Sequence, residues 1–306
     1  MNSTRQNILK VLAYFDYFNH PLTSEDIRSF MPLHYPQLSI DNALRWLHED
    51  GIVFKTGEFY SLQNEPSLTQ RKIRGHETAI KQLVIARKAA KFLSRFPYVQ
   101  TVAVSGSLSK YYADENTDID FFIITSANRL WIARTCMHIF KKLSFIAGKQ
   151  DWFCMNYYID EKQMEIPEKN IFTAMEIVTL MPMEGVSHFQ KFIAANSWIN
   201  NYFPARKILN NATELKKGFI RNGFEKIFNA HFADSIDNWL MKVTDKRWKK
   251  KSGKTKGAKH TKRIGMAVNK HFSKPDPVNF QAKLLKEYEQ RIKELTASLL
   301  HVPADT

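Results

Sequence analysis

A glycine-serine turn and a pair of aspartates lie close together in one stretch of this sequence. Gly106-Ser107 follows a short apolar segment, and Asp118-Ile119-Asp120 opens a second apolar segment after ten intervening residues. Alternate side chains of a β-strand share a face, so Asp118 and Asp120 are expected to point the same way. Two ionised carboxylates side by side repel each other and resist desolvation. The spacing therefore predicts a Mg²⁺ site, because Mg²⁺ commonly uses one or two carboxylates together with phosphate oxygens and water.

The turn before the acids has residue types that suit an anion. Gly106 permits a tight turn and a close approach of the backbone to a ligand. Ser107 is expected to cap a short helix over Leu108–Tyr112, whose free N–H groups would favour an anion. Turn and acids together indicate metal-assisted chemistry on a nucleoside triphosphate. The alternative is that the Asp-x-Asp pair is a solvated strand end.

These motifs resemble the signature of the DNA polymerase beta-like nucleotidyltransferase superfamily, over about residues 71–185. The resemblance implies an α+β fold with a nucleotidyltransferase-type mixed sheet and helices. It also implies that an acceptor hydroxyl takes a nucleoside monophosphate from a nucleoside triphosphate such as ATP. The site residues that it implies are Gly106 and Ser107 at the triphosphate, Lys110 at the position of a family arginine, and Asp118 and Asp120 as ligands of one or two Mg²⁺ ions.

The resemblance further implies a third acid on the next strand. That strand is expected over Asp151–Asp160, after a helix that spans about residues 128–146. Asp151 opens the strand, Asp160 ends it, and Asn156 is its mid-strand polar residue. By strand parity only Asp160 shares the face of Asn156. Three alternatives stay open: Asp151 completes the catalytic acids, Asp160 completes them, or neither does and proton removal is left to water or substrate.

The N-terminal 62 residues form a separate pattern of three expected helices and a hairpin, which resembles a winged helix. We expect the helices at about 3–18, 24–31 and 40–49, and the strands at 52–55 and 58–62. This region holds five Lys and Arg against seven Asp and Glu. Affinity for DNA depends on neutralising phosphates with cations, so we expect packing or protein contact here rather than DNA binding.

A long helix is expected over about Ser67–Phe96, with a basic face that is either solvated or functional. Strand signals fade after Asp160, and helices are expected at Asn170–Met181 and His188–Asn200. These helices would form a subdomain that walls the nucleotide pocket, with core packing expected for most of their side chains.

Positive charge is concentrated near the C-terminus. Residues Lys242–Lys274 hold 13 Lys and Arg against one acid, Asp245, a net of +12 within a chain of net +15. We expect a loosely ordered linker there, which either binds RNA or another polyanion by counterion release or only aids solubility. An amphipathic helix is expected to follow, and to dock on the body of the protein or on a partner.

The composition, with 44% hydrophobic residues and two cysteines, fits a cytoplasmic protein with real cores and no disulfide framework. The polar first ten residues predict no signal peptide, and no apolar run is long enough to predict a membrane span. The alternatives to a nucleotidyltransferase are a catalytically inactive nucleotide- or nucleic-acid-binding protein and a winged-helix regulator with a nucleotide-sensing domain. The expected parts are a winged-helix-like domain (1–65), a catalytic core (66–165), a helical subdomain (166–240), a basic linker (241–275) and a C-terminal helix (276–306).

Overall fold

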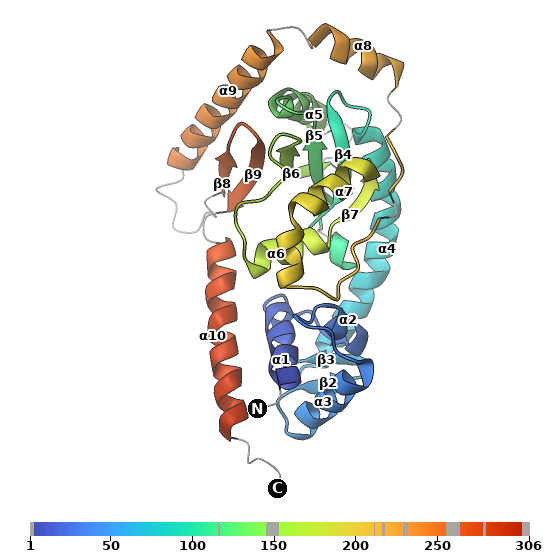
Figure 1. Ribbon diagram of the computed structural model, residues 1–306, viewed down its shortest axis with the longest axis vertical. Helices are drawn as coiled ribbons and strands as arrows, with labels where there is room; N and C mark the ends of the chain where they lie inside the picture. The colour runs from blue at the N-terminus through green and yellow to red at the C-terminus, as the bar shows by residue number, and fades with distance from the viewer. Residues whose placement is uncertain are drawn as a thin grey trace.

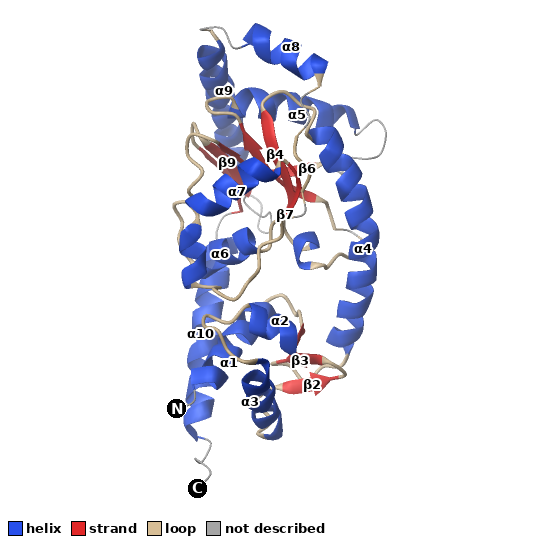
Figure 2. Ribbon diagram, turned by 45° about the vertical axis from the view of Figure 1, so that its right-hand side comes forward, coloured by secondary structure: helices blue, strands red, loops and turns tan. Residues whose placement is uncertain are grey.

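The computed structural model confirms a mixed α+β architecture. It describes residues 3–115, 117–144, 153–210, 212–215, 218–228, 232–254, 264–277 and 280–301. A small N-terminal unit lies at one end of the molecule, and a larger body built on a mixed sheet lies at the other (Figure 1). The long helix α4 (Ser67–Leu93) runs along one side and joins the two, as Figure 2 shows from a second angle.

The N-terminal unit packs three helices against a small antiparallel sheet with the strand order β1-β3-β2. Thr23 caps the second helix by accepting a hydrogen bond from the Asp26 N–H, and the Asp26 side chain accepts from the Thr23 N–H in return. The two-residue strand β1 was not expected from the sequence. The elements are α1 (Ser3–Asp16), β1 (Leu22–Thr23), α2 (Ser24–Ser29), α3 (Gln37–Glu49), β2 (Phe54–Thr56) and β3 (Phe59–Ser61).

The larger sheet has six strands within the described residues, in the order β7-β4-β5-β6-β9-β8. Strand β5 pairs antiparallel with β4 and parallel with β6, so the sheet is mixed. Its strands are β4 (Val99–Val104), β5 (Asp120–Thr125), β6 (Cys154–Asp160), β7 (Met181–Glu184), β8 (Ile264–Val268) and β9 (Phe272–Pro277).

Helices cover both faces of this sheet. Phe121 and Ile123 of β5 pack in one cluster with residues of α4 and of α5 (Leu130–Ser144). Phe122 and Ile124 point to the opposite face and join a cluster that includes α6 (Ile171–Val178) and α7 (Val186–Ala195). This alternation puts Asp120 on the face of α6, because residues two apart on a strand share a face.

The region expected as a helical subdomain, 166–240, is mostly helical in its described part, but it also contributes strand β7 to the sheet. Strand β7 pairs with β4, and Pro182 fits there because β7 is an edge strand. Phe192 of α7 packs on Phe122, with ring centroids 4.9 Å apart. The remaining elements of this region are the 3₁₀ helix η4 (Ser197–Asn201), α8 (Phe219–Phe228) and the start of α9 (Ala233–Lys254).

The sequence predicts a loosely ordered basic linker over 241–275, and this prediction is wrong for the described part of that range, which forms regular elements. Residues 233–254 form α9, and residues 264–277 form the β8–β9 hairpin that extends the sheet beside β6. Helix α9 is held by contacts that composition does not show. Leu240 and Met241 pack on the core, and the Asp237 carboxylate accepts hydrogen bonds from the Trp131 and Ile132 N–H groups at the start of α5, both at 2.9 Å.

The last helix, α10 (Phe280–His301), lies beside the N-terminal unit (Figure 1). Leu284 is fully buried in the cluster that also contains α1. Tyr288 meets Tyr14 of α1 edge to face at 6.1 Å between ring centroids. The two ends of the described chain therefore pack together, and α10 docks within the same chain, one of the two outcomes that its amphipathic pattern predicted.

Candidate functional site

Gly106 brings the backbone against the carboxylate of Asp120. Its φ is +68°, in the left-handed region that favours glycine. A Cβ atom at this position would lie 2.8 Å from Oδ2 of Asp120, which is too close for an ordinary contact. The Ser105 N–H donates to the Asp120 carbonyl at 2.9 Å and holds the two segments in register. Glycine is therefore required here by its backbone angle and by the adjacent acid.

The turn after Gly106 differs in detail from the expectation. The helix η1 spans only Leu108–Lys110, so it is too short to present a helix N-terminus to an anion. Ser107 precedes it without a side-chain capping bond, whereas the Ser109 hydroxyl donates to the Gly106 carbonyl at 2.8 Å. The Ser107 side chain is exposed, which leaves its hydroxyl accessible to a ligand.

Asp120 is the first residue of β5, whereas Asp118 lies two residues before the strand, so only Asp120 has a strand position. Asp120 is partly buried, Asp118 is exposed just before the strand, and Ile119 between them is in the core. Burial raises the pKa of Asp120 to about 6, and the negative charges of Asp118 and Glu176 add to the effect, while a hydrogen bond from the Cys154 thiol opposes it. Because the pKa of Asp120 is higher in the folded chain than its ordinary value, the protonated carboxyl contributes to the stability of the fold at low pH. This contribution is lost as the pH rises through about 6.

The turn and Asp120 line one cavity of about 370 Å³. Ser107, Lys110 and Glu176 line the same cavity, so both charge signs face it. Its volume is within the range of small-molecule sites. Six aromatic side chains from five segments complete its walls: Tyr14, Phe15, Phe18, Tyr112, Phe172 and Phe280.

Glu176 is the site residue that the sequence did not assign. It lies on α6, and its Oε1 accepts a hydrogen bond from Lys110 Nζ at 2.9 Å. The same Nζ donates to the Gly106 carbonyl at 3.0 Å, so Lys110 bridges the turn and the acid. One signal was present in the sequence, because Glu176 is the only ionisable side chain in Ile171–Val178.

The structure does not bring Asp160 to the acid pair. In the parallel register Asp120 faces Cys154 and Thr125 faces Asp160, so Asp160 lies at the far end of the strand, about 17 Å away. It is fully buried and accepts hydrogen bonds from the Asn128 N–H and His271 Nδ1. This environment gives it a structural role.

The parity argument for Asp160 fails for a physical reason. Phe121 pairs with Met155 and Phe122 pairs with Tyr157, so the strand bulges at Asn156 and its alternation is interrupted. Asp151 lies outside the described residues. No acid of the described part of β6 therefore joins Asp118 and Asp120.

The donor set suits Mg²⁺ bound together with a nucleotide. The Asp120 carboxylate lies at the turn, the charge of Asp118 is felt at it, and the glycine leaves room beside Asp120 that a Cβ would fill. Within the described ranges no group of three or more His, Cys, Asp and Glu side chains could hold a metal ion. The remaining ligands would have to be phosphate oxygens and water, which is the common arrangement for this ion.

Protein-family models, curated proteins and solved structures give no match to this chain. None of the described helices is both long enough and apolar enough to cross a membrane.

Proposed function

We propose that this protein is a Mg²⁺-dependent nucleotidyltransferase. The observation that supports this proposal is the position of Asp120, which lies against the Gly106 turn in a cavity that also contains Ser107, Lys110 and Glu176. A carboxylate beside a cation and an open turn is suited to a metal–triphosphate complex. A cavity made only for an apolar ligand would not contain these charges.

The nucleotide lies with its triphosphate at the turn in this proposal. The Ser107 hydroxyl and the Lys110 ammonium bind phosphate oxygens, and Lys110 does so as a point charge. The aromatic side chains of the same cavity, among them Phe18, Phe172 and Phe280, offer faces on which the base stacks.

Asp118 and Asp120 would hold Mg²⁺, and the bound ion supplies positive charge that neutralises the triphosphate. Phosphate oxygens compete with Glu176 for Lys110, so nucleotide binding releases the Glu176 carboxylate from its ion pair. Glu176 then accepts the proton of an acceptor hydroxyl while the hydroxyl oxygen attacks the α-phosphorus. The bond from that phosphorus to the β-phosphate oxygen breaks, and pyrophosphate leaves.

A second candidate is a nucleotide-binding protein without catalysis. It is favoured by the absence of a third acid from the described part of β6, and by the Lys110–Glu176 ion pair, which satisfies the only other acid of the cavity. In this case the protein would bind a nucleotide and release no pyrophosphate.

The N-terminal unit and α9 have other expected roles. The order helix, strand, helix, helix and hairpin supports the likeness to a winged helix. However, α3 ends at Glu49 and is followed by Asp50, and this negative charge favours contact with protein over DNA. Five exposed cations of α9 support binding of a polyanion: Lys242, Lys246, Arg247, Lys249 and Lys250.

Pyrophosphate release from each of the four NTPs with Mg²⁺, and equilibrium binding of Mg²⁺·ATP, test the proposal. We expect Glu176→Gln to keep binding and lower the rate about 10²- to 10⁴-fold, as removal of a proton acceptor does. Asp120→Asn is expected to weaken binding and abolish release. The matched control is Asp50→Asn, at an exposed carboxylate in the N-terminal unit.

Two results would contradict the proposal. Binding of Mg²⁺·ATP that Asp120→Asn does not change would remove the acid pair from the site. Wild-type binding without pyrophosphate release, across a range of hydroxyl compounds and RNA, would favour the non-catalytic candidate.

A further inference from the structure

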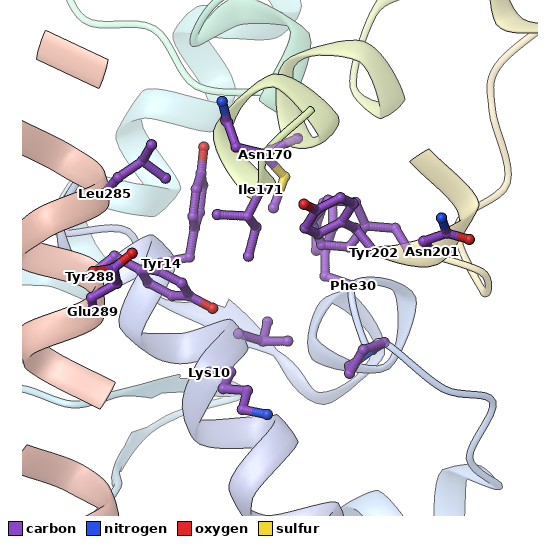
Figure 3. A pocket seen from close by; sticks show the side chains of 14 residues that line it. Lys10, Tyr14, Phe30, Asn170, Ile171, Asn201, Tyr202, Leu285, Tyr288 and Glu289 are labelled. Atoms are coloured by element: carbon purple, nitrogen blue, oxygen red, sulfur yellow. The ribbon is translucent and has the colours of Figure 1, made fainter. Parts of the chain in front are cut away.

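A second cavity of about 380 Å³ adjoins the first, and Figure 3 shows its lining. Its walls are mainly aromatic and aliphatic, with Tyr14, Phe30, Tyr202 and Tyr288 contributing rings. Lys10 and Glu289 lie at its edge with opposite charges. The lining therefore has no net charge and suits a neutral, planar molecule.

The same three helices separate the two cavities. On α6, Phe172 and Glu176 line the first cavity, while Ile171 and Met175 line the second. These pairs are each four residues apart, so they form two neighbouring stripes on one helix. Helices α1 and α10 also contribute side chains to both cavities, and α6 places Glu176 in the first one.

Tyr14 of α1 is the one residue that lines both cavities. Its side chain rises from α1 toward α6, as Figure 3 shows. The residue is only 1% exposed, and its hydroxyl has no hydrogen-bond partner among the residues that the structure describes. A buried hydroxyl without a partner costs free energy, so this group is set to pair with a ligand.

We propose that the second cavity binds the acceptor, a small neutral molecule with a planar body and a hydroxyl group, and that Tyr14 hydrogen-bonds this hydroxyl. The inference rests on the proposed transferase function, and names the acceptor class for it. Stacking against the rings holds the planar body, and Tyr14 holds the hydroxyl at the boundary with the cavity of Glu176.

The position of the basic helix favours a small acceptor over RNA. Helix α9 packs on α5 at the end of the sheet away from the N-terminal unit (Figure 1). The second cavity lies instead between α1, α6 and α10, and Lys10 is the only cation among its lining residues. A polyanion bound along α9 would not place its backbone phosphates there.

Titrations with 7-hydroxycoumarin and coumarin at pH 6, followed by ligand-observed NMR, test this assignment without requiring turnover. We expect the wild type to bind 7-hydroxycoumarin about tenfold more tightly than coumarin, because one hydrogen bond to Tyr14 contributes about that difference in affinity. Tyr14→Phe is expected to bind both equally. This variant should fold, because the hydroxyl that it removes has no described partner.

Leu285→Trp and Val11→Phe each fill the second cavity from a different helix, α10 and α1. We expect both to weaken binding of both coumarins at least tenfold and to leave binding of Mg²⁺·ATP unchanged. Leu33→Trp is the matched control, since Leu33 is 55% exposed and lines neither cavity.

The inference is overturned if the wild type shows no saturable binding, if Tyr14→Phe keeps the preference for 7-hydroxycoumarin, or if both filling variants bind like the wild type. Pyrophosphate release is measured separately. Its failure counts against the proposed transferase function, whereas the coumarin titrations alone decide whether the cavity is a site.

Discussion

At the scale of single residues, the site depends on one glycine and one acid held in contact. Gly106 adopts φ +68° directly beside Oδ2 of Asp120, and the pKa of that acid is raised to about 6, chiefly by burial. An ionised carboxylate in such a position destabilises the folded chain at neutral pH. In the proposed function, bound Mg²⁺ would stabilise the ionised form.

Gly106→Ala is expected to destabilise the protein by about 1–2 kcal/mol through its backbone angle, and also to weaken Mg²⁺·ATP binding at least tenfold by displacing Asp120. Chemical denaturation and equilibrium dialysis measure the two effects. Gly57→Ala is a matched control, since Gly57 has φ +61° and nothing within 4 Å of the added methyl. Nucleotide binding that survives Gly106→Ala as fully as it survives Gly57→Ala would show that the turn is not part of the site.

At the scale of elements, α4 supports the turn from outside the sheet. Gly75 of this helix packs against the ring of Tyr112, and its carbonyl accepts a hydrogen bond from the Ala113 N–H at 3.1 Å. Arg71, one helical turn earlier, donates from Nε to the Tyr112 hydroxyl at 2.8 Å. The segment after η1 is thus fixed by α4, which begins more than 40 residues earlier in the chain. Arg71 of the same helix also lines the first cavity.

Gly75→Ala is expected to destabilise the protein by about 1–3 kcal/mol, although alanine favours a helix, because the new methyl would lie 2.3 Å from Tyr112 Cε2. Urea denaturation measures the loss. Gly223→Ala in α8 is the matched control, where nothing lies within 4 Å and no loss is expected. An equal or greater stability of Gly75→Ala would mean that Tyr112 moves aside at no cost.

At the scale of the whole molecule, both cavities exist only where the N-terminal unit, α6 and α10 meet. Tyr14 comes from the first helix of the chain and Tyr288 from the last described one. Arg291 Nε lies 3.6 Å from Asp16 Oδ2 beside this contact, and a partly exposed ion pair at this distance contributes little to stability. Helix α10 lines the first cavity through Phe280 and the second through Leu285, Tyr288 and Glu289, and apolar packing holds it in place.

Leu284→Ala is expected to cost about 2–5 kcal/mol, because Leu284 is fully buried between α10 and the core. Looser docking of α10 is also expected to weaken the binding of both Mg²⁺·ATP and 7-hydroxycoumarin, and calorimetry measures both affinities. Leu38→Ala, at a residue 69% exposed on α3, is the control and should change neither. Full affinity for both ligands in a destabilised Leu284→Ala protein would show that α10 stabilises the fold without shaping the cavities.

The sequence alone determined the local features of the site. The unbroken apolar run Phe121–Ile124 specifies a strand that is buried on both faces, and Asp118 and Asp120 stand where that run begins. A glycine before Ser107 permits the turn. These are short-range properties of strand parity and backbone sterics, so a reading of neighbouring residues predicts them.

Only the tertiary structure decided which distant groups complete the site. The bulge at Asn156 and the parallel register put Asp160 at the wrong end of the strand, and α6 supplied Glu176 instead. Likewise, α9 is a helix that packs on α5, although the high charge of its second half predicted a linker. Strand register and helix docking are set by burial summed over the whole chain, which a local pattern does not contain.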